Sequence, residues 1–289
     1  MNSLTIVIVN YNSREYLSKC IGSIYAETQI DGFQVVIVDN GSHDQDFSDL
    51  KSRYPQIHFI LNRANLGFAR ACNQGLQAYP AGYYLLLNPD CEVLDGAADK
   101  ALSFIECHPE IGIVGCRVNN PDGSLQLACR RSIPRPSTAL YRFLGLSFLF
   151  PGNPKLARYN LSFMDERKIH EVEAVSGSFL LFRDALGRDI GLLDERFFLY
   201  GEDLDFCYRA LQHGWKIYYY PEAEVIHHKR RSSSLSVKAS THHYYNAMEI
   251  FYRKHYGSQS GPLQSRAVIT AIRLLRFLNR WRGMVGSDR

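Results

Sequence analysis

The sequence lacks the short motifs that identify several common classes of protein. It has no Cys-x-x-Cys pair, so its seven scattered cysteines do not form a zinc ribbon. No Gly-x-Gly-x-x-Gly follows a predicted strand, and Gly-x-x-x-x-Gly-Lys-Ser/Thr is absent. These absences argue against an NAD-dependent dehydrogenase and a P-loop NTPase. Any nucleotide must therefore be held by other residues.

Long apolar runs are missing as well. The first run, Leu4–Val9, has six residues and no basic lead, so it is too short for a signal peptide. The run Phe143–Phe150 has eight residues, far fewer than a membrane span requires. The odd number of cysteines fits a reducing compartment. We therefore expect a cytoplasmic protein.

A strong excess of one charge is also absent. Lys and Arg number 33 and Asp and Glu 29, and a net charge of +4 is too small for the whole chain to bind nucleic acid. Residues 252–289 hold eight Lys or Arg and one acid, a local charge of +7, which leaves −3 on the rest. With 46% hydrophobic residues, this mildly acidic body is able to bury a core.

What the first half does contain is a regular alternation of strand and helix patterns. Continuous β-branched runs predict buried strands, and the segments between them predict helices, the first capped by Ser13. The predicted strands are 4–9, 33–38, 57–61, 83–87 and 111–116, and the helices end near residues 26, 54, 79 and 107. This alternation is typical of an α/β fold with a doubly wound, mostly parallel sheet.

Polar clusters follow three of these strands, at 10–12, 39–42 and 88–90. Ligands of such sheets bind beyond the carboxyl ends of the strands, so the clusters predict a nucleotide pocket. Asp39 either accepts hydrogen bonds from a base or ribose, or shapes a turn with Gly41. Asn88-Pro-Asp90 either supplies oxygen ligands for Mg²⁺ or Mn²⁺, or forms a plain β-turn.

The pattern weakens after Cys116. Residues 119–170 are typical of a long insertion, with a helix near 137–149. Regular elements return with a strand over Glu171–Phe182, a helix ending near His213 and a strand over Lys216–Tyr220. No low-complexity linker separates the halves, so we expect one domain with a C-terminal appendage.

Two clusters in the second half are candidates for chemistry. The acids of Glu202-Asp203-Leu204-Asp205 either complement the dipole of the helix that follows or include a general base. His227 is either a ligand for an ion such as Mn²⁺ or a structural histidine, since His242-His243 shows that paired histidines also occur elsewhere.

Five motifs, taken together and in order, resemble glycosyltransferase family 2, in its rhamnosyltransferase-like branch. They are Val7-Ile-Val-Asn-Tyr-Asn12, Val38-Asp-Asn-Gly-Ser42, Asn65-Leu-Gly-Phe-Ala-Arg-Ala-Cys-Asn73, Leu87-Asn-Pro-Asp90 and Phe198-Leu-Tyr-Gly-Glu-Asp-Leu-Asp205. The similarity covers roughly residues 3–230. It implies a GT-A fold, which is a Rossmann-like, mostly parallel sheet flanked by helices. It also implies a nucleotide-sugar donor, a divalent metal (Mn²⁺ or Mg²⁺) and inverting transfer to an acceptor hydroxyl.

The resemblance carries roles onto individual residues. It implies Asp203 as the base with Glu202 beside it, and Asp90 and His227 as metal ligands. Asn88 departs from the family's metal motif, so it helps only through its amide oxygen or a water. The residues implied to bind the nucleotide sugar are Asn10, Tyr11, Asn12, Asp39, Asn40, Arg70, Asn73 and Asn88. An inverting displacement needs one base and no protein nucleophile, and a metal neutralises the leaving diphosphate.

The implied glycosyltransferase domain is 1–230, with 1–118 as the nucleotide-sugar-binding half and 119–230 as the acceptor and catalytic half. The remaining 231–289 is expected to be a helical, membrane-associating segment. Residues 266–282 project as a basic amphipathic helix, typical of membrane surfaces, and the alternative is a helix packed on the body or against a second copy in a homodimer. One arc carries Arg266, Arg273, Arg276 and Arg280, interrupted only by Ile269. The apolar residues on the rest of the helix are Val268, Ile272, Leu274, Leu275, Phe277, Leu278 and Trp281.

These expectations combine into one function. The resemblance implies transfer of rhamnose from dTDP-rhamnose to a lipid-linked glycan acceptor, for cell-surface polysaccharide, at the inner face of the cell membrane. The alternatives are a transferase using a UDP-sugar, a nucleotidyltransferase, and a non-catalytic membrane-associated scaffold. The nucleotidyltransferase would need a Gly-rich basic loop near the N-terminus, which the sequence lacks.

Overall fold

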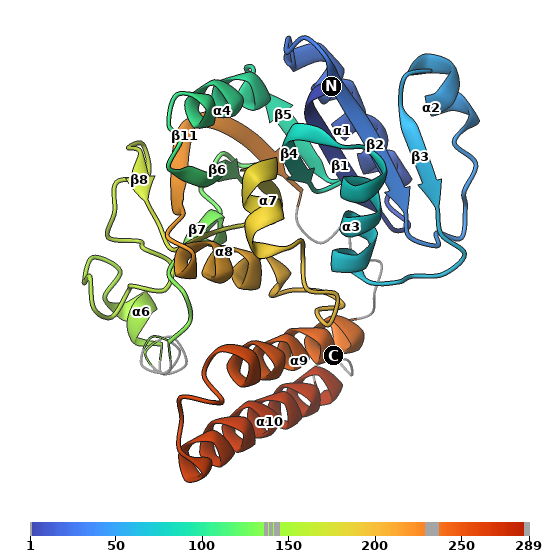
Figure 1. Ribbon diagram of the computed structural model, residues 1–289. Coiled ribbons are helices and arrows are strands. Elements are labelled where there is room, and N and C mark those ends of the chain that lie inside the picture. The colour runs from blue at the N-terminus through green and yellow to red at the C-terminus, as the bar shows by residue number, and fades with distance from the viewer. Residues whose placement is uncertain (1, 136–137, 139–140, 142–144, 229–236, 286–289) are drawn as a thin grey trace.

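The computed structural model describes residues 2–135, 138, 141, 145–228 and 237–285 (Figure 1). Within these residues, nine strands form the central sheet. Eight of them follow the order β3-β2-β1-β4-β10-β6-β11-β5, and β8 pairs with β11. Two more strands, β7 and β9, form a small separate sheet.

The first four strands along the central sheet, from β3 to β4, are parallel to one another, as the sequence predicts. These strands are β1 (Asn2–Asn10), β2 (Phe33–Asp39), β3 (His58–Leu61) and β4 (Ala81–Leu87). The β-branched runs of β1 and β2 are buried because helices cover both faces. The register pairs Asn10 with Asp39, so the first two polar clusters meet at the carboxyl edge.

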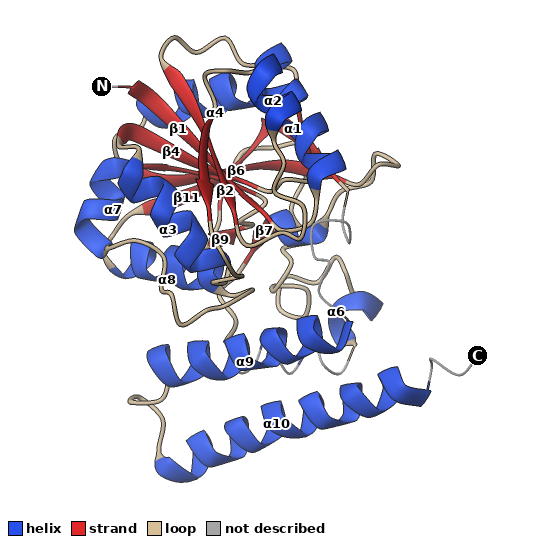
Figure 2. Cartoon of the chain, turned by 90° about the vertical axis from the view of Figure 1, so that its right-hand side faces the viewer, coloured by secondary structure: helices blue, strands red, loops and turns tan. Residues whose placement is uncertain are grey.

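Helices flank the sheet on its two faces (Figure 2). On one face lie α1 (Arg14–Glu27), α2 (Ser48–Arg53) and α4 (Ala97–Glu106), and on the other lie α3 (Phe68–Ala78), α7 (Asp184–Ile190) and α8 (Glu202–Gln212). The expected cap of α1 does not form, because the Ser13 hydroxyl donates to the carbonyl of Tyr11 instead.

The single strand expected over Glu171–Phe182 is wrong. The segment forms β8 (His170–Glu171), β9 (Ala174–Val175) and β10 (Phe179–Arg183), because Ser176-Gly177-Ser178 separates the last two. Strand β10 inserts antiparallel between β4 and β6 (Ile111–Asn119). A strand from the second half of the chain therefore joins the two parts of the sheet.

Strand β11 (Lys216–His227) is longer than the predicted 216–220. It pairs parallel with β6 and antiparallel with β5 (Cys91–Leu94). A register shift between Tyr220 and Glu224 accommodates Pro221, which has no N–H to donate to the sheet. The extension carries His227 to the position opposite Cys91, beside the third polar cluster.

The insertion at 119–170 is mostly irregular where it is described. It holds a short 3₁₀ turn, Leu127–Cys129, the strand β7 (Arg130–Arg131) and the helix α6 (Leu146–Leu149). The helix expected near 137–149 lies partly outside the described residues. Strand β7 pairs with β9, and β9 packs on α8, so Arg131 reaches the start of that helix.

The C-terminal helices α9 (Val237–His255) and α10 (Pro262–Val285) form a hairpin in which α9 lies between the body and α10 (Figures 1 and 2). Tyr245, Tyr252 and Ile272 pack between them. The outward face of α10 exposes the apolar side chains of Leu263, Leu274, Phe277 and Leu278. The side chains of Arg280 and Trp281 lie outside the described residues. None of the described helices is both long and apolar enough to cross a membrane.

Candidate active site

The turn after β2 is organised by Asp39. Its fully buried carboxylate accepts hydrogen bonds from Asn10 Nδ2 (2.7 Å), Ser42 Oγ (2.6 Å), Ser42 N (3.0 Å) and Gln45 Nε2 (2.6 Å). A carboxylate has about four acceptor positions, so these bonds use its capacity. Asp39 therefore shapes the turn, and in doing so it fixes the end of β1 through Asn10.

Asn40 ties this turn to the loop before α3. Its Nδ2 donates to Asn65 Oδ1 (3.0 Å) and to the carbonyl of Gly67 (3.1 Å), and its Oδ1 accepts from Leu66 N (3.0 Å). Gly41 has φ +81° and lies so close to Ala64 that an added Cβ would stand 2.5 Å from a backbone carbon. The Asp-Asn-Gly segment therefore holds two loops together.

A pocket of about 390 Å³ opens beside these turns. Asn10, Tyr11 and Asn12 contribute to its lining, as predicted for the end of β1. The other lining residues, Arg14, His43 and Asp44, were missed by sequence reasoning, although they flank the predicted polar clusters. The Arg14 guanidinium donates to Asp44 Oδ2 (3.0 Å) and Asp49 Oδ1 (2.5 Å), so the wall carries both charges.

The third polar cluster meets His227 at the sheet edge. His227 Nε2 lies 3.1 Å from Asp90 Oδ1 and 3.3 Å from Asn88 Nδ2. The Asp90 side chain is fully buried and that of His227 is 12% exposed. Sequence reasoning assigned these residues to one site, and the fold brings them together from β11 and the loop after β4.

Gln126, which the sequence did not single out, sets the tautomer of His227. The Gln126 amide Nε2 donates to the carbonyls of Asn119 (3.4 Å) and His227 (2.7 Å), so its Oε1 must act as an acceptor. Since Oε1 lies 2.9 Å from His227 Nδ1, that nitrogen carries the proton. The lone pair of neutral His227 is then on Nε2, which faces Asp90, the arrangement found in metal-binding histidines.

Cys91 is the third potential ligand in this group. Its sulfur lies within 4.8 Å of ligand atoms of Asp90 and His227. The thiol donates to the carbonyl of Ser178 (3.4 Å), and burial followed by the charge of Asp90 raises the pKa of Cys91. A thiol that keeps its proton is a poor ligand. The groups suited to Mg²⁺ or Mn²⁺ are therefore the Asp90 carboxylate and the His227 imidazole.

Asp203 lies in the first turn of α8, and three donors hold its carboxylate. Oδ1 accepts from Leu204 N (2.7 Å), and Oδ2 accepts from Arg131 Nη2 (2.6 Å) and Gly177 N (3.1 Å). The Asp203 and Arg131 side chains are 13% and 11% exposed. Arg131 was missed from the sequence because no periodic pattern in 119–170 indicates which side chains point inward.

Glu202 differs from its neighbour in its environment. It is buried, and its Oε2 has no hydrogen-bond partner among the described residues. Burial, followed by the charge of Asp203, raises the pKa of Glu202 to about 8. The two adjacent acids therefore have different states near neutral pH, with a proton held on Glu202 and an ion pair at Asp203.

Two consecutive residues join Asp203 to the group that contains Asp90 and His227. Gly177 N donates to Asp203 Oδ2, while the carbonyl of Ser178 accepts from Asn88 N (3.1 Å) and from the Cys91 thiol. Adjacent residues lie about 3.8 Å apart along the chain. The short segment before β10 thus brings Asp203 and the Asp90–His227 pair to one place.

The α3 motif positions the loop that leads into α8. Both ends of the Asn73 amide bind the backbone of Leu193, through Nδ2 (2.9 Å) and Oδ1 (3.1 Å). Phe68 N donates to the carbonyl of Phe198 (2.7 Å). Arg70 is exposed, and its Nε lies 3.8 Å from Glu195 Oε2. The fold thus uses Asn73 to hold the loop before Glu202, and it leaves Arg70 at the surface.

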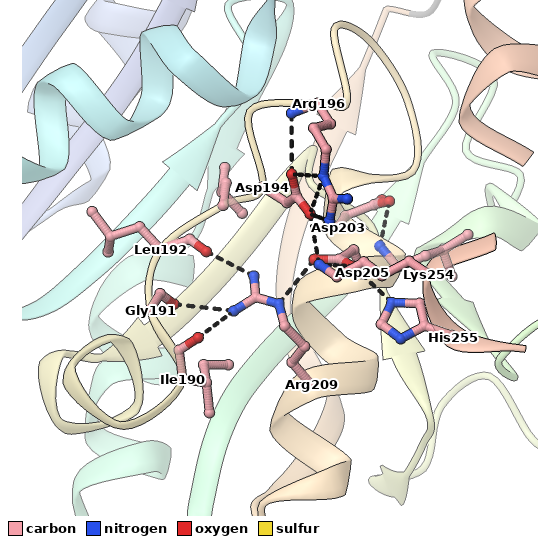
Figure 3. Close-up of polar contacts among 12 residues, drawn as sticks. Ile190, Gly191, Leu192, Asp194, Arg196, Asp203, Asp205, Arg209, Lys254 and His255 are labelled. Atoms are coloured by element: carbon pink, nitrogen blue, oxygen red, sulfur yellow. Dashed lines mark hydrogen bonds and ion pairs between the residues drawn. The ribbon is translucent and has the colours of Figure 1, made fainter. Parts of the chain in front are cut away.

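Asp205, two residues after Asp203, anchors the C-terminal helices (Figure 3). Its fully buried carboxylate meets Arg209 Nε (2.9 Å), Lys254 Nζ (2.6 Å) and His255 Nε2 (2.7 Å). Burial would raise the pKa of Asp205, but the hydrogen bonds from these three partners outweigh it and hold that pKa below its ordinary value. The first turn of α8 is therefore fixed to α9 as well as to β7.

The sequence matches the family model described as "Glycosyltransferase like family 2" over residues 2–246. It is 29% identical over 273 residues to the N-acetylglucosaminyl-diphospho-decaprenol L-rhamnosyltransferase of Mycobacterium tuberculosis, covering 90% of this chain and 88% of that protein. It is 28% identical over 235 residues to a low-salt glycan biosynthesis hexosyltransferase of Haloferax volcanii, covering 79% of this chain and 68% of that protein.

Among solved structures, the fold is similar to that of GalNAc-T7, crystallised with UDP, GalNAc and Mn²⁺. The TM-score is 0.62 at 15% identity, and the match covers 96% of this chain and 54% of the GalNAc-T7 chain. At this identity the likeness concerns the fold alone. It confirms the expected GT-A architecture, with its mixed, mostly parallel sheet and flanking helices.

Proposed function

The chain belongs to glycosyltransferase family 2 and is a glycosyltransferase, and from this premise we propose that it moves rhamnose from dTDP-rhamnose to a hydroxyl of a lipid-linked glycan. The convergence of Asp203 with the Asp90–His227 pair at Gly177-Ser178 carries the catalytic part of this proposal. The name of the M. tuberculosis relative supports the donor sugar and the lipid-linked acceptor. The product serves cell-surface polysaccharide synthesis.

The donor lies along the carboxyl edge of the sheet. Its nucleoside enters the pocket lined by Asn10, Tyr11 and Asn12, next to the turns that Asp39 and Asn40 organise. Its diphosphate points toward Asp90 and His227. Asp90 and His227 would hold a divalent ion, Mn²⁺ or Mg²⁺, whose positive charge would neutralise the leaving diphosphate. The donor set fits such an ion because it joins a carboxylate oxygen to an imidazole with an available lone pair.

The transfer is a single inverting displacement. The acceptor hydroxyl oxygen forms a bond to the anomeric carbon while the bond from that carbon to the phosphate oxygen breaks. The electron pair of the broken bond leaves with the nucleoside diphosphate, and the hydroxyl proton passes to the Asp203 carboxylate. One base is sufficient for this chemistry, and no protein nucleophile is required.

The enzyme works at the inner face of the cell membrane, where α10 holds it close to its acceptor. The outward face of α10 offers Leu263, Leu274, Phe277 and Leu278 to the bilayer. Exposed arginines such as Arg266 and Arg273 lie on the same helix and favour anionic headgroups. Arg273 also pairs with Glu249 of α9, so part of this charge is already balanced.

The test is a transfer assay with a panel of nucleotide sugars and a polyprenyl-diphosphate-linked N-acetylglucosamine acceptor. We expect rapid dTDP release and a rhamnosylated lipid only with dTDP-rhamnose, and no transfer by Asp203→Asn at undiminished donor binding. Transfer from a UDP-sugar instead would replace the donor assignment. Absence of nucleotide release with every donor, in the presence of Mn²⁺, would point to the non-catalytic scaffold.

A further inference from the structure

Arg131 is the one arginine that contacts the carboxylate of the base among the described residues. Its Nη2 donates to Asp203 Oδ2 at 2.6 Å and to the carbonyl of Val175 at 3.0 Å. The pairing of β7 with β9 places Arg131 opposite Ala174 and so fixes the direction from which its side chain reaches Asp203. The guanidinium is thus fixed to the backbone of β9 as well as to the base.

Its neighbour Arg130 shows what a purely structural arginine does in the same strand. Successive side chains of a strand point to opposite faces. Arg130 turns away from the base, donates to the carbonyls of Met164 and Asp165, and lies over the ring of Tyr219. Arg131 instead forms an ion pair with Asp203. The Nε of Arg131, like that of Arg130, is buried and has no hydrogen-bond partner among the described residues.

Stability alone does not explain the buried ion pair of Arg131 with Asp203, because removing both charges from water costs free energy. Burial opposes the charge of Arg131, but the Asp203 carboxylate outweighs it, and the pKa of the guanidinium lies above its ordinary value. Buried ion pairs with incompletely satisfied groups add little net stability compared with apolar residues of the same volume. The location of the pair, on the base, therefore suggests a function in orienting that base.

The geometry leaves one acceptor position for a substrate. A carboxylate has about four such positions. On Asp203, Arg131 and Gly177 N occupy Oδ2, and Leu204 N occupies one position on Oδ1. The remaining position is on Oδ1, which then receives the acceptor hydroxyl proton. Without Arg131 only the backbone donors Gly177 N and Leu204 N would hold the carboxylate, so the direction of Oδ1 would be less firmly fixed.

We propose that Arg131 is a positioning residue for the base: its ion pair to Asp203 Oδ2 turns Oδ1 toward the acceptor hydroxyl. This inference rests on the proposed function, because it takes Asp203 as the base of glycosyl transfer. It assigns Arg131 to the acceptor side of the reaction. It also distinguishes Arg131 from a ligand of the donor diphosphate, which would act through donor binding.

The experiment compares Arg131→Met, Arg131→Lys and a matched control, Arg117→Met. Arg117 is equally buried, at 12% exposed, but its ion pair is with Glu166 at 2.8 Å, away from the base. For each variant, kcat and donor KM are measured, together with nucleoside diphosphate affinity by calorimetry. We expect Arg131→Met to lose about 100-fold in kcat, as misplacement of a reacting group does, with donor KM within about threefold. Arg131→Lys should recover part of the loss.

Two outcomes would overturn the proposal. One is a kcat for Arg131→Met within about threefold of wild type or of Arg117→Met, since a positioning group should cost about 100-fold. The other is a rise in donor KM that matches the fall in kcat, which would make Arg131 a donor ligand. If Arg131→Met does not fold, Arg131→Gln takes its place and is judged by the same criteria. Asp203→Asn is run in parallel: full transfer by that variant would instead remove the base assignment itself.

Discussion

His227 Nε2 lies 3.1 Å from Asp90 Oδ1, although the two residues are 137 positions apart in the sequence. Gln126 Oε1 accepts from His227 Nδ1, so Nε2 is the nitrogen that faces the carboxylate. We therefore expect His227→Ala and Asp90→Asn to lose the increase in melting temperature that Mn²⁺ causes in the wild type. Gln126→Leu should need about 10- to 100-fold more Mn²⁺ for the same rise in melting temperature, because it removes the hydrogen-bond partner of a metal ligand.

The matched control for this site is His228→Ala. His228 is adjacent in sequence, but its Nε2 pairs with Glu92 Oε1 at 2.8 Å. It should keep the response of the wild type to Mn²⁺. A normal Mn²⁺ response in His227→Ala and Asp90→Asn would contradict the assignment, whatever their activity.

Glu202 predicts an unusual dependence of stability on pH. Its pKa is about 8 in the folded chain and 4.5 ordinarily, so the folded state keeps a proton that the unfolded state loses between these values. Stability is therefore lost as pH rises through this window. Glu202→Gln has no proton to lose at this position. The melting temperature of this variant minus that of the wild type should therefore increase from about pH 5 to about pH 8 and be constant below about pH 5. The half-exposed Glu195→Gln should follow the wild type throughout.

Asp205 predicts a large contribution to stability from a single buried carboxylate. Asp205→Asn leaves Arg209, Lys254 and His255 without their shared anion, so urea unfolding at pH 7 should show a loss of about 3 kcal/mol or more. Because the pKa of Asp205 is lower in the folded than in the unfolded chain, its carboxylate adds stability at pH values above the unfolded pKa. That stability is lost as the pH falls, so the difference in unfolding free energy between wild type and Asp205→Asn should decrease in acid. Asp189→Asn, at an exposed ion pair with His213, should reduce stability far less than Asp205→Asn does. Equal effects would contradict a special role for Asp205.

The outward face of α10 predicts binding to anionic vesicles. Leu274→Glu and Phe277→Glu place a charge on its exposed apolar stripe and should reduce sedimentation with phosphatidylglycerol vesicles at least tenfold, with unchanged melting temperature. Gln264→Glu adds the same charge at another exposed position of the helix and serves as the control. Failure of the wild type to sediment, together with a dimer in solution that both glutamate variants disrupt, would assign the face to a second copy instead.

The sequence predicted the parts of the site that depend on local pattern. Buried β-branched runs located β1 and β2, and the polar residues at their ends led to the pocket of Asn10, Tyr11 and Asn12. These two inferences need only the period of a strand and the direction in which it ends. The placing of Asp90 and His227 in one site needed the resemblance to the family.

What the sequence could not predict depends on contacts between distant segments. Arg131 reaches Asp203 only because β7 pairs with β9, and each of these strands has two residues. Gln126 meets His227 across an irregular loop. Asn73 matches a motif implied to contact the donor, yet its amide is bound to Leu193, 120 residues away. No local period encodes such pairs.

The insertion of β10 between β4 and β6 has a consequence for biosynthesis. Until Phe179–Arg183 has left the ribosome, β4 and β6 each keep an unpaired edge, and the sheet cannot close. The nascent chain must therefore wait for pairings between residues nearly 100 positions apart, as between Leu87 and Phe179, which makes folding slow and late. The same event seats Gly177 and Ser178, so a chain stopped before this strand would gain neither a finished sheet nor an assembled catalytic centre.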